Sequence, residues 1–412
     1  MATGCAGKHG EIGADTGESG GDTAAPVDVY APAISQDSAS LEEWEPALAN
    51  DGANNLVSSW TEWPGGNANF PLGVSFSGDG GTTWSAPADI VSPDGSAADS
   101  VVEPLGTGFV LAWYDHNGAA PHIYAATGNA ATGFGAPVEV SDPADDADYD
   151  KPWLTHLADG TALLTYQKVT GRKYAGIAAT SSDGGRWTRS TMIEDTTFRN
   201  LYYPCASDAG RVYVTYYVEG AIGLGYSDDG GVTWTMNDSA LGTPSNLSFA
   251  EPECVAQSEH VWVVYGNSTV DPDGDSTGVN PRLDQLFLAD VAGDGTVTTT
   301  PIPLASYALA PQIALETSGA IDLTWYAGND IGDPAGTFVR TQVLNDVVGE
   351  PVTWRTGVAF SPDRSADGWV GDYGGVRWIP DSDGTTGNLA ATLVQTGADG
   401  YGHVSFVRAS VP

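Results

Sequence analysis

One eight-residue pattern recurs along this chain and constrains its fold more than any other feature. Residues 77–84 read S-G-D-G-G-T-T-W and residues 227–234 read S-D-D-G-G-V-T-W, so both fit S-x-D-x-G-x-x-W. Residues 181–187 form a copy that has lost one residue before its Trp, and residues 127–134 form an eroded copy in the same frame. The Asp of such a turn can accept backbone hydrogen bonds, Gly supplies a positive φ, and Trp covers the turn. The pattern therefore predicts hairpin turns in a β structure.

A longer repeat surrounds these turns, with a period of about 50 residues, which is typical of a four-stranded propeller blade. Each copy has a strand start, often at a Pro, followed by an apolar run that usually ends in an aromatic residue. The copies begin near residues 45, 99, 151, 203, 251, 310 and 372. Alternating β-branched and aromatic residues favour strands, and no long stretch has helical periodicity. The sequence predicts an all-β chain.

A segment near the N-terminus is predicted to supply the fourth strand that the last repeat lacks. The seventh copy stops at Pro412 after only three strands, and residues 27–34 resemble the fourth strands predicted at 85–91 and 135–140. Pairing of this segment with the last copy would hide a sheet edge. We therefore expect a single seven-bladed β-propeller over residues 26–412, closed by an N-terminal strand, with six blades as the alternative. Residues 1–25 are expected to form a flexible acidic tail.

The charge of the chain limits its partners. Asp and Glu number 53 against 15 Lys and Arg, for a formal net charge of −38. Such a charge opposes binding to nucleic acid or anionic lipid. No apolar run is long enough to span a bilayer. We expect a monomer, extracellular or at the cell surface or in the periplasm.

Three cysteines carry two further hypotheses. Met1 to Cys5 is similar to the end of a bacterial lipoprotein signal, which predicts a lipid anchor at Cys5, although the apolar region that should precede it is absent and Cys5 could instead be an ordinary residue. Cys205 and Cys254 lie in corresponding inner strands of neighbouring repeats, offset by one place, and so project from opposite sheet faces. A bridge between them is possible, but two separate buried thiols are the preferred interpretation.

The repeated turns resemble the Asp boxes of the BNR/Asp-box superfamily, whose best-known members are sialidases. In that family the boxes lie on the face away from the active site, so the resemblance implies a propeller rather than an activity. Sialidases grip the substrate carboxylate with three arginines, because bidentate guanidinium groups suit that task. The first Arg of this chain is Arg172, beyond the first two repeats. The triad cannot be mapped, and sialidase activity itself is not expected.

Ligands of propellers usually meet the face formed by the loops that enter the inner strands and those that join the second and third strands. On this rim the sequence predicts six ligand-binding residues: Trp44, Trp63, Lys168, Arg172, Lys173 and Tyr202. The cations could hold a carboxylate or sulfate of an acidic sugar, or they could be solvated and paired with nearby Asp. The candidate catalytic residues are His116, Tyr203 and Glu251, because His, Tyr and Glu serve as acid–base groups.

Two function classes follow from this rim. The first is a surface propeller that binds glycans or a protein partner without catalysis. The alternative is a carbohydrate-active enzyme, a glycosidase or a polysaccharide lyase acting on acidic glycans. No cofactor is required by either. Asp271, Asp273 and Asp275 place carboxylates at alternate positions and superficially resemble a Ca²⁺ loop, although the EF-hand pattern is broken and an ordinary acidic turn is the alternative.

Overall fold

The structure is a computed structural model that describes most of the chain. The described residues are 29–31, 34–35, 42–52, 54–64, 69–93, 95–116, 121–241, 252–269, 282–329, 336–358, 370, 373–381, 386–396 and 401–411. Within these ranges the regular elements are all β-strands and none is a helix. The predicted all-β fold is confirmed.

Five separate antiparallel sheets follow one another along the chain. The first contains β2 (Glu42–Asn50), β3 (Leu56–Trp63), β4 (Leu72–Ser77) and β5 (Ala88–Ile90). The second contains β6 (Ala97–Leu105), β7 (Gly108–Asp115), β8 (His122–Asn129), β9 (Gly133–Phe134) and β10 (Val138–Glu139). The third contains β11 (Asp148–His156), β12 (Ala162–Thr170), β13 (Lys173–Ser181) and β14 (Thr188–Asp195). The fourth contains β15 (Arg199–Ala206), β16 (Val212–Val218), β17 (Ala221–Ser227) and β18 (Thr235–Asn237). The fifth contains β19 (Glu253–Gln257), β20 (His260–Asn267), β21 (Gln285–Val291) and β22 (Val297–Ile302).

The sixth sheet has nine strands and contains two antiparallel meanders. One consists of β23 (Tyr307–Leu315), β24 (Ile321–Gly328), β25 (Gly336–Leu344) and β27 (Val352–Val358), with β26 (Val347–Val348) beside β25. The other consists of β28 (Gly375–Pro380), β29 (Gly387–Thr396), β30 (Gly402–Val411) and β1 (Val29–Ala31). The single register pair Val358↔Gln395 joins the two meanders.

The N-terminal segment pairs with the last strand, as predicted. Tyr30 of β1 stands opposite Val407 of β30 in an antiparallel register. Beyond β1, the Ile34 N–H donates to the Val404 carbonyl at 2.8 Å, and the Ile34 side chain is buried. The two ends of the chain therefore share one sheet, which covers the edge that β30 would otherwise expose.

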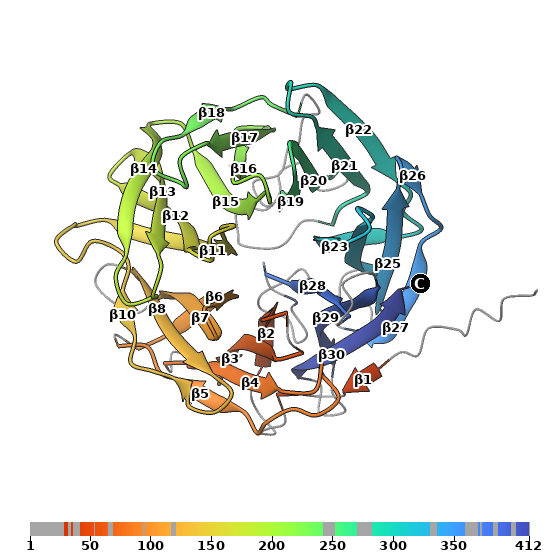
Figure 1. Cartoon of the computed structure of the whole chain (residues 1–412), viewed down its shortest axis with the longest axis horizontal. Helices are drawn as coiled ribbons and strands as arrows, with labels where there is room; N and C mark the ends of the chain where they lie inside the picture. The colour runs from red at the N-terminus through yellow and green to blue at the C-terminus, as the bar shows by residue number, and fades with distance from the viewer. Residues whose placement is uncertain are drawn as a thin grey trace, which may run out of the picture.

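The sheets surround a central axis, and the strands nearest the centre are β2, β6, β11, β15, β19, β23 and β28 (Figure 1). The contacts between these inner strands run in a cycle from β2 through β6, β11, β15, β19, β23 and β28 back to β2. A recurring hydrogen bond ties neighbouring sheets together. Thr165 Oγ1 donates to the Tyr202 carbonyl of the next sheet, and Thr215 Oγ1 donates to the Pro252 carbonyl of the sheet after that. This arrangement is that of a β-propeller.

Most of the inner strands contain a bulge at the same height. At the bulge one residue has a positive φ: Glu45, Asp99, Lys151, Leu201 and Ala310. When the bulges of β11 and β15 are aligned by their strand pairing, Leu201 corresponds to Lys151 and Tyr203 corresponds to Trp153. The sequence repeat had aligned Tyr203 with Lys151, and that alignment is wrong by two positions. A Pro is not essential at the bulge, because Tyr202 stands where Pro152 stands in the third sheet.

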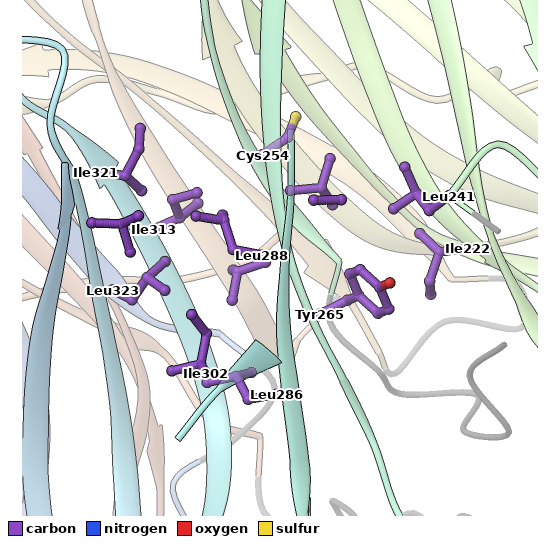
Figure 2. Packing of buried hydrophobic residues seen from close by; sticks show 14 of the residues in the cluster. Ile222, Leu241, Cys254, Tyr265, Leu286, Leu288, Ile302, Ile313, Ile321 and Leu323 are labelled. Carbon is purple, nitrogen blue, oxygen red and sulfur yellow. The ribbon is translucent and has the colours of Figure 1, made fainter. Parts of the chain in front are cut away.

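The hydrophobic core lies between neighbouring sheets. Its largest cluster spans the fourth, fifth and sixth sheets. In Figure 2, Leu288 of β21 lies beside Ile313 of β23, and Ile222 of β17 lies beside Tyr265 of β20. The alternating apolar residues of each strand thus fill the space between blades, and burial of these side chains is the main stabilising contribution.

The repeated turns form the hydrogen bonds that their sequence predicts. Asp229 Oδ1 accepts from the Thr233 N–H at 2.8 Å, and Ser227 Oγ accepts from the Gly231 N–H at 2.8 Å. Trp234 Nε1 donates to the Gly231 carbonyl at 3.0 Å. Residues 77–84 form the same set of bonds. We call the face that carries residues 77–84, 181–187 and 227–234 the motif face, and the opposite one the loop face.

A disulfide joins Cys205 of β15 to Cys254 of β19, with the two Cα atoms 5.8 Å apart. The preferred interpretation of two separate thiols is therefore wrong. The predicted offset of one place is what makes the bridge possible, because the two side chains leave facing sides of neighbouring sheets and meet between them.

Candidate functional site

A cavity of about 260 Å³ lies among the inner strands at the axis. Residues of β2, β6, β11, β15, β19, β23 and β28 line it, most of them near the strand ends. Its ionisable lining residues are Glu103, His156, Tyr203 and Arg377. Polar groups that converge in a concave, otherwise apolar site are the usual mark of a binding site.

Arg377 and Glu103 form the centre of this group. Arg377 Nη2 lies 2.6 Å from Glu103 Oε1, and His156 Nδ1 lies 3.0 Å from Glu103 Oε2. The Glu103 side chain is 8% exposed, that of Arg377 27% and that of His156 53%. Burial would raise the pKa of Glu103, but the charge of Arg377 and the hydrogen bond from His156 outweigh it and lower the pKa. The same hydrogen bond raises the pKa of His156.

A second buried carboxyl, that of Glu253 in β19, also interacts with Arg377. Burial raises the pKa of Glu253 to about 8, against the opposing effects of the Arg377 charge and of hydrogen bonds from the Ile313 N–H and Tyr203. The Ile313 N–H lies 3.3 Å from Glu253 Oε2. Burial also raises the pKa of Tyr203, which interacts with both Glu253 and Arg377. These opposite shifts favour the ionised form of Glu103 and the protonated form of Glu253 at neutral pH.

Aromatic rings fill the axis on the loop-face side of this cluster. The ring of Trp153 stacks on that of Tyr373, with centroids 4.2 Å apart and an interplanar angle of 22°, and lies 4.5 Å from the ring of Tyr203. Above them, Lys151 Nζ lies 5.4 Å from the Tyr373 centroid and 3.1 Å from Asp99 Oδ2. Lys151 and Asp99 side chains are each only 7% exposed.

Two of the three predicted cations pair with carboxylates. Lys168 pairs with Asp145, and Lys173 Nζ lies 2.8 Å from Glu194 Oε1. Arg172 is exposed at the turn between β12 and β13. For Lys168 and Lys173 this matches the alternative that the sequence left open, in which loop cations are paired with nearby acids.

The candidate catalytic residues His116 and Tyr203 contact different groups. His116 Nδ1 lies 3.0 Å from the Tyr114 hydroxyl at the end of β7, whereas Tyr203 lines the axial cavity. Tyr202, a predicted ligand contact, is fully buried and stacks on Tyr216 with centroids 5.6 Å apart.

Of the remaining predicted site residues, two are tryptophans that the structure describes, and four lie outside the described residues. Trp44 and Trp63 form an aromatic pair with centroids 5.5 Å apart. Glu251, Asp271, Asp273 and Asp275 lie outside the described residues. Among the residues that the structure does describe, no group of three or more His, Cys, Asp or Glu side chains is placed to hold a metal ion. Calcium binding stays a prediction.

Sequence reasoning missed Glu103, His156, Glu253 and Arg377. A signal was present, because Glu103 and Arg377 are each a charged residue within a short apolar run, at 101–104 and 375–378. A charge inside a buried strand is rare unless it is paired. The search for a site had been confined to the loops.

Comparison with solved structures shows the fold. A Hadza microbial sialidase superposes with a TM-score of 0.51 and 13% identity, over 90% of this chain and 66% of that chain. A protein of unknown function from Dyadobacter fermentans superposes with a TM-score of 0.51 and 14% identity, over 93% and 98%. This chain thus spans less than two thirds of the sialidase chain. Likeness at such low identity establishes a sialidase-like propeller fold and leaves the chemistry to the site itself.

No protein-family model and no curated protein matches this chain. The described residues include no helix long and apolar enough to cross a membrane.

Proposed function

We propose that this protein is a glycan-directed propeller that binds an anionic sugar residue in its axial cavity. The observation that carries the proposal is Arg377, whose guanidinium lines the cavity in a chain with a net charge of −38. The guanidinium has five N–H donors. Among the described residues, Glu103 at 2.6 Å, the Val376 carbonyl at 2.9 Å and the Tyr203 hydroxyl accept hydrogen bonds from it, and these three use only part of this capacity.

The charges around Arg377 favour an anion. When His156 is protonated, it and Arg377 carry two positive charges against the single negative charge of Glu103, and Glu253 adds none while it is protonated. The carboxylate of an acidic sugar would balance this excess positive charge. The hydroxyl groups of the same sugar could form hydrogen bonds with the Tyr203 hydroxyl and the Asn50 amide, which also line the cavity. The sialidase-like fold supports a glycan as the ligand class. This site replaces the rim as the preferred location.

Titration calorimetry with acidic and neutral monosaccharides tests the proposal. We expect sialic or uronic acids to bind and neutral hexoses to bind more weakly or not at all. A charge-assisted hydrogen bond contributes roughly 1.5–3 kcal/mol, so Arg377→Ala should weaken binding about 10- to 100-fold. Arg186→Ala, an exposed Arg in a motif turn, is the matched control and should bind normally. Absence of binding by every acidic sugar would contradict the proposal.

Hydrolysis of an acidic glycan is the second candidate function. It is favoured by the two axial carboxyls of opposite protonation, since glycosidases pair a protonated acid with an ionised carboxylate. Glu253 itself is not among the cavity-lining residues, which favours binding without turnover. Release of reducing sugar from uronate polymers, lost in Glu253→Gln while binding is retained, would establish the enzyme.

We further propose seven blades, with the two meanders of the sixth sheet counted separately. The cycle of seven inner strands and the single register pair between the meanders support this count. We also propose an extracellular or cell-surface location, because a disulfide between neighbouring sheets suits an oxidising compartment. A lipid anchor at Cys5 remains a proposal, which mass spectrometry of the protein from its native cells would test.

A further inference from the structure

We infer that the ligand enters the axial cavity from the motif face, opposite to the loop face on which the sequence predicts a site. The inference rests on the proposed function, because it concerns the route and the form of the same ligand. It leads to a specific ligand class: the terminal acidic sugar of a glycan chain rather than an internal one.

The position of the motif turns defines the direction of the cavity. In the first sheet β2, β3 and β4 are successive antiparallel strands, so β2 and β4 end on the same face. The motif begins at Ser77, where β4 ends, and the Gly80 N–H donates at 2.9 Å to the Asn54 carbonyl in the turn after β2. The ends of the inner strands therefore lie on the motif face.

The cavity opens at these same strand ends. Asn50, His156 and Ala206, the last residues of β2, β11 and β15, all line it. His156 is 53% exposed there, whereas Glu103, two residues before its strand ends, is 8% exposed. Exposure thus falls from the motif face inward. A ligand entering here meets His156 before Arg377 and Glu103.

The other end of the channel is filled. Along β11, Lys151 comes first, then Trp153, and His156 last. Trp153 is 5% exposed and Tyr373 1%, and their stacked rings occupy the axis between the loop face and Arg377. The buried Lys151–Asp99 pair lies beyond them. A chain cannot thread through such a channel, so the cavity accommodates a chain end only.

Mouth-filling variants test the route. Ala256 and Ala206 are partly exposed lining residues near the ends of β19 and β15. We expect Ala256→Phe and Ala206→Phe each to weaken binding of a uronic or sialic acid more than 10-fold while the melting temperature stays near that of the wild type. The matched bulky control is Thr196→Phe, an exposed residue after β14 on the loop face, which should bind normally.

The outcomes separate the route from the function. If the wild type binds, Arg377→Ala does not, and both mouth variants bind normally, the motif-face route is wrong while the proposed function stands. Weaker binding in the rim variant Arg172→Ala together with normal binding in the mouth variants would assign entry to the loop face. If the wild type binds no acidic sugar, the proposed function fails.

A measurement without variants tests the same inference and does not depend on the folding of any substitution. Uronate oligomers of increasing length should bind in proportion to the concentration of chain ends, with one protein per end. Binding that increases instead with the number of internal sugar units, at a fixed concentration of ends, would overturn the inference.

Discussion

Arg377 and Glu103 lie 274 positions apart in the chain, yet Arg377 Nη2 and Glu103 Oε1 are 2.6 Å apart at the axis of the propeller. They come from β28 and β6, which are not neighbours in the cycle of inner strands. Only β2 lies between them in that cycle, so the contact spans one intervening blade rather than joining adjacent blades. It links the stability of the ring to the chemistry of its central cavity.

Removal of one partner of this pair should destabilise the fold. Glu103→Ala leaves Arg377 without its carboxylate in a largely buried position, and such a change costs about 3 kcal/mol. Urea unfolding measures the effect. Glu103→Ala combined with Arg377→Ala should cost less than the sum of the single changes. The exposed pair Arg211–Asp228 is the control, and its loss should change the free energy of unfolding by less than about 1 kcal/mol. Additive effects at Glu103 and Arg377 would contradict the coupling.

Stability should fall as the pH rises from about 5 to 8. Burial raises the pKa of Glu253 from 4.5 to about 8 and that of Glu62 to about 7. In this window the folded state keeps protons that the unfolded state has released, so unfolding becomes easier with increasing pH. Thermal melts at several pH values give the slope. In Glu253→Gln the slope should be smaller than in the wild type, and parallel curves would show that Glu253 does not contribute.

Loss of the disulfide should destabilise the protein strongly. Cys205 and Cys254 are 49 positions apart, and closing a loop of that size stabilises by about 4 kcal/mol in the chain-entropy description. The double variant Cys205→Ser/Cys254→Ser should therefore unfold at lower denaturant concentration, and dithiothreitol should have the same effect on the wild type only. An unchanged midpoint in the double variant would mean that the bridge does not form in solution.

Deletion of residues 1–36 should weaken the whole ring, because β1 covers the edge of β30 and Arg355 lies 3.8 Å from the ring centroid of Tyr30. The melting temperature is the readout. Deletion of residues 1–25 alone, the predicted tail, serves as the control and should leave it unchanged. Equal melting temperatures for the two deletions would contradict the closure.

The sheets could be predicted from the sequence because each repeat contains local signals for its own strands and turns. The turn at Ser227 to Trp234 and the strand β16, which contains Tyr216, are determined by residues close together in the chain. The error at Tyr203 has a physical cause. A bulge adds a residue to the inner strand without requiring Pro, so Pro204 is not a guide to the register.

The site could not be predicted in the same way. Which side chains meet at the axis depends on how many inner strands surround it and on their relative heights, and neither is a local property. Each of Glu103 and Arg377 is a charge within a short apolar run, but only the closed ring shows that the two meet. The burial that raises the pKa of Glu253 likewise comes from several sheets rather than from the neighbours of Glu253 in the sequence.

The most direct test of the account is a crystal structure of the protein soaked with an acidic monosaccharide that binds in solution. The account predicts electron density for the sugar in the axial cavity, with its carboxylate within hydrogen-bonding distance of Arg377 and the rest of the ring toward His156 and the motif face. Density at the rim near Trp44 and Arg172, with an empty axial cavity, would contradict it.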